Sequence, residues 1–169
     1  MKVAIYSPYL DTLGGGERYM MTIAEILSSK NWVDVLLDTN LFLQNIDRLK
    51  KNLSERFGLN LSSVNFIEAP LGKDSNSFQR ALFLMRYDLL VVLTDGSIFY
   101  PTSTKSILHI QSPIKGQPAK SIWGKLKLNG WDTIIYNSRF TQQTSQKYWP
   151  KKSKVIYPPV DCDQIIPLK

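Results

Sequence analysis

Residues 2–18 read KVAIYSPYLDTLGGGER and hold the clearest structural signal in the sequence. An apolar, β-branched run at residues 2–7 is followed by a turn with three successive glycines, and a helical pattern begins at Glu17. Glycine lets the backbone approach a ligand closely, and the amides at a helix N-terminus attract anions. We therefore expect a buried strand, a turn that binds a diphosphate or another anion, and a helix. The alternative is a turn whose glycines only supply positive φ.

Apolar and amphipathic stretches alternate along the rest of the chain. The first helical stretch places apolar residues at the spacing of one helix face: Met20, Ile23, Ala24 and Leu27. Such patterns predict helices at residues 17–29, 42–57, 77–85 and 138–148, and strands at 2–7, 33–38, 64–67, 88–94, 104–110, 132–136 and 154–157. Strands that are apolar on both faces, with helices between them, form parallel sheets covered on both sides. The predicted fold is thus α/β, a Rossmann-like, doubly wound, mainly parallel sheet with helices on both faces.

The same spacing assigns faces to two of the later helices. Phe78, Leu82 and Met85 are expected to face the core from the helix at residues 77–85. In the helix at 138–148, Phe140, Thr144 and Tyr148 belong to one stripe with a spacing of four residues. Ligands of doubly wound sheets bind outside the carboxyl ends of the strands, so site residues should follow the strands directly.

Positive charge is concentrated in the last third of the chain. The net charge of +7 consists of −1 over residues 1–100 and +8 over residues 101–169. Phosphates, an anionic membrane surface or a nucleic acid suit such a region, and a solvated basic face is the alternative. No recognised nucleic-acid motif accompanies the charge, so we expect no nucleic-acid partner.

Other sequence features bear on location and on metals. No apolar stretch has the length of a membrane span, and the N-terminal apolar run is too short for a signal peptide. We therefore expect a cytoplasmic protein. The single cysteine, Cys162, has no second thiol for a disulfide and no partner ligands for a metal site. We expect neither a metal nor a cofactor.

The glycine turn partly matches the dinucleotide-binding fingerprint G-x-G-x-x-G. Gly14 and Gly16 fit its first two glycines, but Tyr19 stands at the third, where a side chain holds helix and strand apart. Asp38 follows the second predicted strand, where an acid that binds ribose would lie. A standalone nucleotide-dependent oxidoreductase is therefore one alternative function, and a basic, non-enzymatic binding module is another.

Five stretches in a fixed order carry a resemblance to a known family. They are Gly14-Gly15-Gly16-Glu17-Arg18, Thr94-Asp95-Gly96-Ser97, Leu108-His109-Ile110-Gln111-Ser112-Pro113, Asn137-Ser138-Arg139-Phe140-Thr141 and Val155-Ile156-Tyr157-Pro158-Pro159-Val160-Asp161. Together they resemble the N-terminal domain of the retaining glycosyltransferases of family 4 (group 1), which have the two-domain GT-B fold.

This resemblance implies a division of labour between two domains. Residues 1–157 would form the Rossmann-like, acceptor-side domain, residues 158–169 would begin the interdomain linker, and the C-terminal donor domain would be absent. The full enzyme would be a glycosyltransferase of hexosyltransferase type. It would move a sugar from a nucleotide-sugar donor to a hydroxyl of a glycan, a lipid-linked molecule or a small molecule, with retention. The chain alone would be inactive.

The resemblance also implies roles for particular residues. The amides of Gly15 and Gly16 would contact the donor diphosphate, and His109 would be the catalytic residue that contacts the transferred sugar. The implied acceptor-binding residues are Glu17, Arg18, Asp95, Ser138 and Arg139. Two alternatives come from local chemistry, since Asp95 is also suited to capping the next turn and Ser138 to capping the following helix.

The segment from Lys115 to Lys127 combines lysines with Trp123. Lysine with tryptophan suits a membrane interface, and many members of the resembled family dock on the cytoplasmic membrane face to reach lipid-linked acceptors. A peripheral contact with an anionic membrane is therefore one interpretation. The other, which we favour from the sequence, is a surface helix that packs Trp123, Leu126 and Leu128 on the domain.

Overall fold

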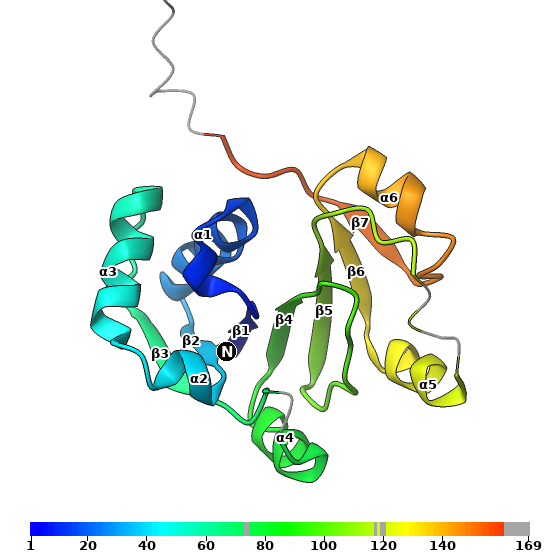
Figure 1. The fold of residues 1–169 in the computed structure, drawn as a ribbon, viewed down its shortest axis with the longest axis horizontal. Coiled ribbons are helices and arrows are strands. Elements are labelled where there is room, and N and C mark those ends of the chain that lie inside the picture. The colour runs from blue at the N-terminus through cyan, green and yellow to red at the C-terminus, as the bar shows by residue number, and fades with distance from the viewer. Residues whose placement is uncertain (73–74, 117, 119–120, 161–169) are drawn as a thin grey trace, which may run out of the picture.

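A computed structural model describes residues 1–72, 75–116, 118 and 121–160, and these form one α/β domain (Figure 1). Seven parallel strands make a single sheet in the order β3-β2-β1-β4-β5-β6-β7. The strands are β1 (Lys2–Tyr6), β2 (Trp32–Leu37), β3 (Val64–Glu68), β4 (Leu89–Leu93), β5 (Lys105–Ile110), β6 (Thr133–Tyr136) and β7 (Ser153–Val155). The helices are η1 (Leu10–Thr12), α1 (Gly15–Ser28), α2 (Thr39–Phe42), α3 (Ile46–Phe57), α4 (Ser77–Leu84), α5 (Ile122–Gly130) and α6 (Arg139–Ser145).

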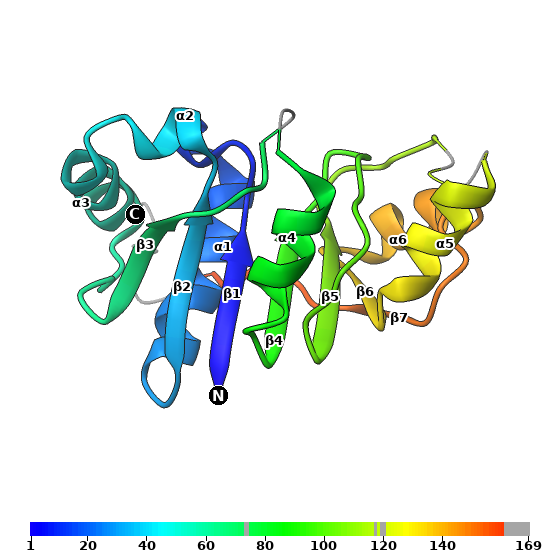
Figure 2. The same ribbon diagram turned by 90° about the horizontal axis from the view of Figure 1, so that it is seen from below.

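Helices cover the two faces of the sheet in two groups. Helices α1 and α3 lie on one face, and α4, α5 and α6 lie on the other (Figure 2). Alternate residues of β1 feed the two cores, since Val3 and Ile5 pack with α1 and α3 while Ala4 and Tyr6 pack with the opposite group. This arrangement confirms the predicted doubly wound α/β fold.

The order of the strands reverses between β1 and β4. From β1 the chain builds outward through β2 and β3, then returns to place β4 on the other side of β1. Crossovers between parallel strands are right-handed. Those that run toward β3 therefore place their helices on one face of the sheet, and those that run toward β7 place theirs on the other. The loops after β1 and β4 therefore part from each other and leave a crevice at the carboxyl edge.

The helix predicted at residues 42–57 begins later in the structure. Helix α3 starts at Ile46, and the separate short helix α2 before it ends at Phe42. The side chain of Asp38 accepts a hydrogen bond from the amide of Leu41 and begins α2, and the side chain of Asn45 accepts one from Arg48 and begins α3. The second cap interrupts the helix because Asn45 has extended backbone.

The predicted burial of two helix faces is wrong. Phe78, Leu82 and Met85 are 69%, 52% and 62% exposed, and Leu84 is the buried residue of α4 instead. On α5, Trp123 is 72% exposed and Leu126 is 49% exposed, and only Leu128 packs on the domain as expected. A helical spacing shows which residues share a stripe, but in short helices it does not show which stripe meets the sheet.

The buried carboxylate of Asp34 on β2 connects neighbouring elements. It accepts hydrogen bonds from the Tyr87 hydroxyl at 2.9 Å, the Trp32 indole at 2.7 Å and the Asn65 amide at 3.0 Å. The Lys2 ammonium lies 3.8 Å away. Side chains from β1, β2, β3 and the residues before β4 thus share one acceptor, which fixes this end of the sheet.

Loss of this acceptor should destabilise the domain. We expect Asp34→Ala to lower the free energy of unfolding by about 3 kcal/mol, because three donors lose their partner, and Tyr87→Phe to lower it by about 1 kcal/mol. Urea denaturation measures both. The control Glu55→Ala removes an exposed carboxylate that pairs with Lys51 at 3.7 Å and should change stability by less than about 0.5 kcal/mol. Equal losses for Asp34→Ala and Glu55→Ala would contradict this assignment.

Candidate functional site

A pocket of about 350 Å³ lies at the carboxyl edge where the strand order reverses. Its walls come from the residues after β1, the first turn of α1, and the ends of β4 and β5. They are Pro8, Tyr9, Gly16, Glu17, Leu93, Thr94, Asp95, Gln111, Ser112 and Ile114. In open α/β sheets this crevice is the general place for ligands.

The glycine turn is held in shape by the carboxylate of Glu17. Glu17 is buried and accepts hydrogen bonds from the Gly14 amide at 2.9 Å and the Thr12 hydroxyl at 3.1 Å. The Ser7 hydroxyl donates to the second oxygen at 3.5 Å. Glu17 therefore ties the end of β1 to the first turn of α1 as well as lining the pocket.

The turn packs directly against the strands on the other side of the crevice. A Cβ at Gly16 would lie 2.9 Å from the Leu93 side chain and 2.9 Å from the side-chain oxygen of Gln111. A Cβ at Gly15 would lie 3.3 Å from the side-chain nitrogen of Gln111. The amides of a first helical turn have no carbonyl within their own helix to bind. Together with the helix dipole, the amides of Gly15 and Gly16 suit an anion such as a diphosphate.

Gln111 is a site residue that the sequence interpretation missed. Its side-chain oxygen is buried, and no hydrogen-bond partner for it is found in the described part of the chain. Buried amide oxygens are normally satisfied, so this acceptor is available to a ligand hydroxyl in the adjoining pocket. Its position directly after β5 was the available signal, because site residues are expected there.

Asp95 and Tyr9 form a hydrogen-bonded pair at the pocket. The Tyr9 hydroxyl donates to one oxygen of Asp95 at 2.6 Å, and the amide and hydroxyl of Ser97 donate to the other at 3.0 and 2.6 Å. Partial burial alone would raise the pKa of Asp95, but these hydrogen bonds outweigh it and hold the pKa below its usual range. Asp95 thus both caps its turn and presents an ionised acceptor to the pocket.

The structure places His109 inside the domain. It is 1% exposed, and its ring stacks on that of Tyr19 with centroids 4.2 Å apart and planes 5° from parallel. Burial lowers the pKa of His109 to about 4, with partial compensation from the backbone of Ile135. His109 is therefore neutral at neutral pH. It does not line the pocket, and its catalytic role stays a prediction.

Three other predicted residues lie away from this pocket. Arg18 lines a separate hollow beside the end of α3. Ser138 caps α6 by accepting a hydrogen bond from the Thr141 amide at 3.1 Å, and Arg139 is exposed. Of the predicted residues, the pocket therefore brings together Gly16, Glu17 and Asp95, with Gly15 beside them.

A second, larger hollow of about 880 Å³ lies along the same edge, after β2 and β3. It is lined by Asp38, Thr39, Asn40, Glu68, Ala69, Pro70, Gly72, Ser75, Asn76 and Gln79. Burial raises the pKa of Tyr6 to about 12, and the charges of Asp38 and Asp95 add to this shift. The charges of one carboxylate from each hollow therefore act on the Tyr6 hydroxyl, which stays protonated at neutral pH.

The described residues hold neither a cluster of metal ligands nor a helix that could span a membrane. Within 1–72, 75–116, 118 and 121–160 there is no group of three or more His, Cys, Asp or Glu side chains placed to hold a metal ion. No helix in those ranges is long and apolar enough to cross a membrane. Cys162 and most of the predicted linker fall outside the described residues.

Comparison with known proteins identifies a similar fold. No protein-family model matches the chain, and no curated protein matches it by sequence. Among solved structures, HepE of Anabaena, crystallised in complex with UDP and glucose, is similar with a TM-score of 0.53 and 16% sequence identity. The similarity covers 96% of this chain and 46% of the HepE chain, so this chain spans about half the length of HepE. At this identity the comparison establishes the shared fold.

Protonation of buried His109 should make stability depend on pH. The unfolded chain takes up this proton near pH 6.5 and the folded chain only near pH 4, so the unfolded state binds more protons between these values. We expect His109 to withdraw about 3 kcal/mol of stability as the pH falls from 6.5 to 4. Urea denaturation of the wild type and His109→Phe across this range isolates the effect, because both share all other titrating groups. A difference between them that does not change with pH would show that His109 is not buried as described.

Proposed function

We propose that this chain is the acceptor-side domain of a glycosyltransferase that moves a sugar from a nucleotide-sugar donor to an acceptor hydroxyl with retention. The observation that carries the proposal is the pocket at the strand reversal, where a helix N-terminus with two bare glycines faces an ionised carboxylate. The fold similarity to a protein crystallised with UDP and glucose supports it, since a nucleoside diphosphate and a hexose are the two parts of a nucleotide sugar.

The donor diphosphate would lie at the glycine turn. Developing negative charge on the leaving diphosphate is stabilised by preorganised amides and by a helix dipole. Gly15 and Gly16 supply such amides at a position where any side chain would displace Gln111. In the proposal a second, C-terminal domain completes the donor site, consistent with this chain matching 46% of the HepE chain.

The acceptor would occupy the two hollows of the carboxyl edge. Asp95 accepts from hydroxyl groups at the pocket, and Asp38 and Glu68 are the carboxylates of the larger hollow. The raised pKa keeps the Tyr6 phenol neutral, so in the proposal it would be a hydrogen-bond donor near these carboxylates. A row of carboxylates, amides and hydroxyls suits a polyhydroxylated acceptor such as a glycan, whose reacting hydroxyl reaches the smaller pocket. Catalysis would rest on this positioning and on stabilising the leaving group, without a metal or cofactor.

The role proposed for His109 requires a change in the packing around its ring. For its imidazole to contact the transferred sugar, as the resemblance implies, the packing that buries His109, which includes the stacked Tyr19 ring, must open. The pocket is not lined by Ser138, Arg18 or Arg139. In the proposal these residues would bind parts of the acceptor that extend outside the pocket. The activity of His109→Ala beside that of Tyr19→Ala tests whether the imidazole is reached.

The dinucleotide alternative is less well supported by the local structure. The Asp38 carboxylate accepts a hydrogen bond from the Leu41 amide and begins α2. Tyr19, which stands at the third glycine position of the fingerprint, is buried and donates a hydrogen bond to the Ile156 carbonyl at 3.0 Å. A bulky side chain in this place fills the contact that the fingerprint glycine leaves open.

Sugar transfer by the full-length protein tests the proposal. One sugar nucleotide of a panel should be consumed, with nucleotide release as the readout. Gly16→Ala should lower kcat/KM for that donor about a hundredfold, because the added Cβ displaces Gln111 and Leu93 from the pocket. Its matched control is Gly116→Ala, since a Cβ at Gly116 meets nothing within 4 Å.

The acceptor side has its own variant pair. Asp95→Asn should raise the acceptor KM about tenfold, because a charged acceptor of hydroxyl hydrogen bonds is lost. Asp11→Asn changes an exposed carboxylate on η1 that does not line the pocket, so it should leave the acceptor KM unchanged. Consumption of no donor, together with binding of NAD(H) by the chain, would replace the transferase proposal with the dinucleotide alternative.

A further inference from the structure

Two polar side chains lie next to each other behind the first turn of α1. His109 and Gln111 are two residues apart at the end of β5, so both point to the face of the sheet that α1 covers. The two ring nitrogens of His109 and the side-chain oxygen of Gln111 are buried, and none of them makes a hydrogen bond within the described residues. The backbone of Ile135 acts on the His109 ring without completing a hydrogen bond. Buried polar groups are normally satisfied, so this pair calls for a state in which the packing around it is open.

The ring of Tyr19 covers the imidazole of His109. The two rings are nearly parallel, with centroids 4.2 Å apart and planes at 5°. Gln111 reaches the pocket at the strand reversal, whereas neither His109 nor Tyr19 lines it. Of the two polar side chains, His109 is therefore the one that Tyr19 keeps inside the domain.

The hydroxyl of Tyr19 is held by the segment that follows the last strand. It donates a hydrogen bond to the Ile156 carbonyl at 3.0 Å, across 137 residues of sequence. The Ile156 amide donates to the Tyr136 carbonyl at 2.9 Å, which attaches Ile156 to β6. Figure 1 shows the segment after β7 running in the direction of α1. Tyr19 is thus in contact with His109 through its ring and with this segment through its hydroxyl.

The chain stays beside α1 after Ile156. Pro159 and Val160 line a hollow of about 480 Å³ together with residues of α1 and of the end of α3. Pro158 and Pro159 make this stretch stiff, because each proline ring fixes its backbone φ. A stiff segment transmits a displacement at one end to the other, so a shift of the chain at Val160 reaches Ile156.

We propose that Tyr19 is a positioning residue that couples the segment at residues 156–160 to His109. While Ile156 holds the Tyr19 hydroxyl, the ring stays on the imidazole and His109 stays buried. When the segment shifts, the hydroxyl loses its acceptor and the ring is released from the imidazole. Access to His109 therefore depends on where the chain leaves the domain. Its use in sugar transfer rests on the proposed function, but the coupling itself is a property of the folded domain and does not require that reaction.

An NMR titration of the His109 imidazole tests the coupling. His109 is the single histidine of the sequence, and the spectrum of His109→Phe confirms the assignment of its signals. Protonation favours the open state, because a buried imidazolium lacks solvation. Tyr19→Phe keeps the stacked ring and removes only the hydrogen bond to Ile156. It should therefore make opening easier and raise the pKa of His109 by about half a unit from the wild-type value of about 4.

Tyr87→Phe is the matched control for this variant. It removes a hydrogen bond of similar length, 2.9 Å, from another fully buried tyrosine, which packs in the core on the opposite face of the sheet. A general loss of stability would affect both variants. The coupling predicts instead that Tyr87→Phe leaves the pKa of His109 at its wild-type value.

Pro158→Gly/Pro159→Gly tests the other end of the coupling. Two glycines make the segment flexible and weaken its hold on Ile156, so the pKa of His109 should rise in the wild-type background. In the Tyr19→Phe background the same change should add nothing, because both variants remove one link. The proposal is overturned if Tyr19→Phe leaves the pKa of His109 unchanged, or if Tyr87→Phe raises it equally. It is also overturned if the glycine variant has no effect in the wild type or adds its full effect to that of Tyr19→Phe.

Discussion

The close approach of the glycine turn to the ends of β4 and β5 is the constraint on which the candidate site depends. At Gly16 there is no room for a Cβ beside Leu93 and Gln111, so α1 begins directly against the neighbouring strands. Glu17 holds the turn from within by accepting from Gly14 and Thr12. The strand reversal opens the crevice, and this contact turns the crevice into a pocket with amides on one wall and a carboxylate on the other.

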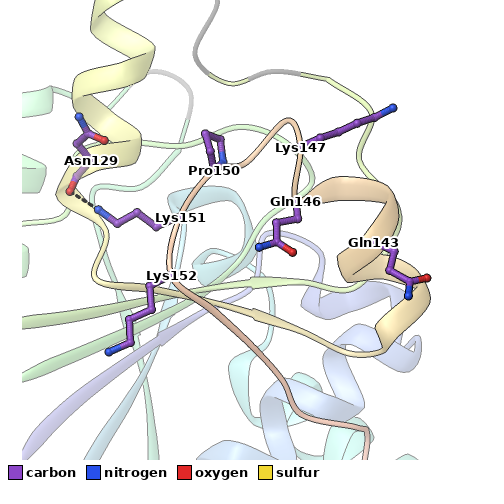
Figure 3. Close-up of a pocket in the computed structure, with 7 residues that line it drawn as sticks. All are labelled: Asn129, Gln143, Gln146, Lys147, Pro150, Lys151 and Lys152. Carbon is purple, nitrogen blue, oxygen red and sulfur yellow. Dashed lines mark hydrogen bonds between the residues drawn. The ribbon is translucent and has the colours of Figure 1, made fainter.

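Acidic and basic side chains gather on different parts of the molecule. The carboxyl edge carries Asp95, Asp38 and Glu68 and suits hydrogen bonding to hydroxyl groups. Helices α5 and α6, which border a hollow lined by Lys147, Lys151 and Lys152 (Figure 3), lie on the face of the sheet that α4 also covers, opposite α1 (Figure 2).

The fold was predictable from the sequence, and much of the site was not. Apolar strands separated by helices determine a parallel sheet, and the glycine turn after β1 marks its carboxyl edge, where the structure has Gly16, Glu17 and Asp95. The roles of these three residues stay predictions. His109 was assigned from the order of motifs, but a stacking partner such as Tyr19 comes from tertiary packing that spacing does not encode. The same limit explains why Phe78 and Trp123 face outward. Periodicity shows which residues share a stripe of a helix, but it does not show whether that stripe faces the core or the solvent.

The most direct test of the account is a crystal structure of the full-length protein bound to a nucleotide sugar. The account predicts diphosphate oxygens within about 3 Å of the amides of Gly15 and Gly16, with the sugar beside Asp95 and Gln111. A nucleotide whose ribose instead lies at Asp38, with no phosphate at the glycine turn, would contradict it.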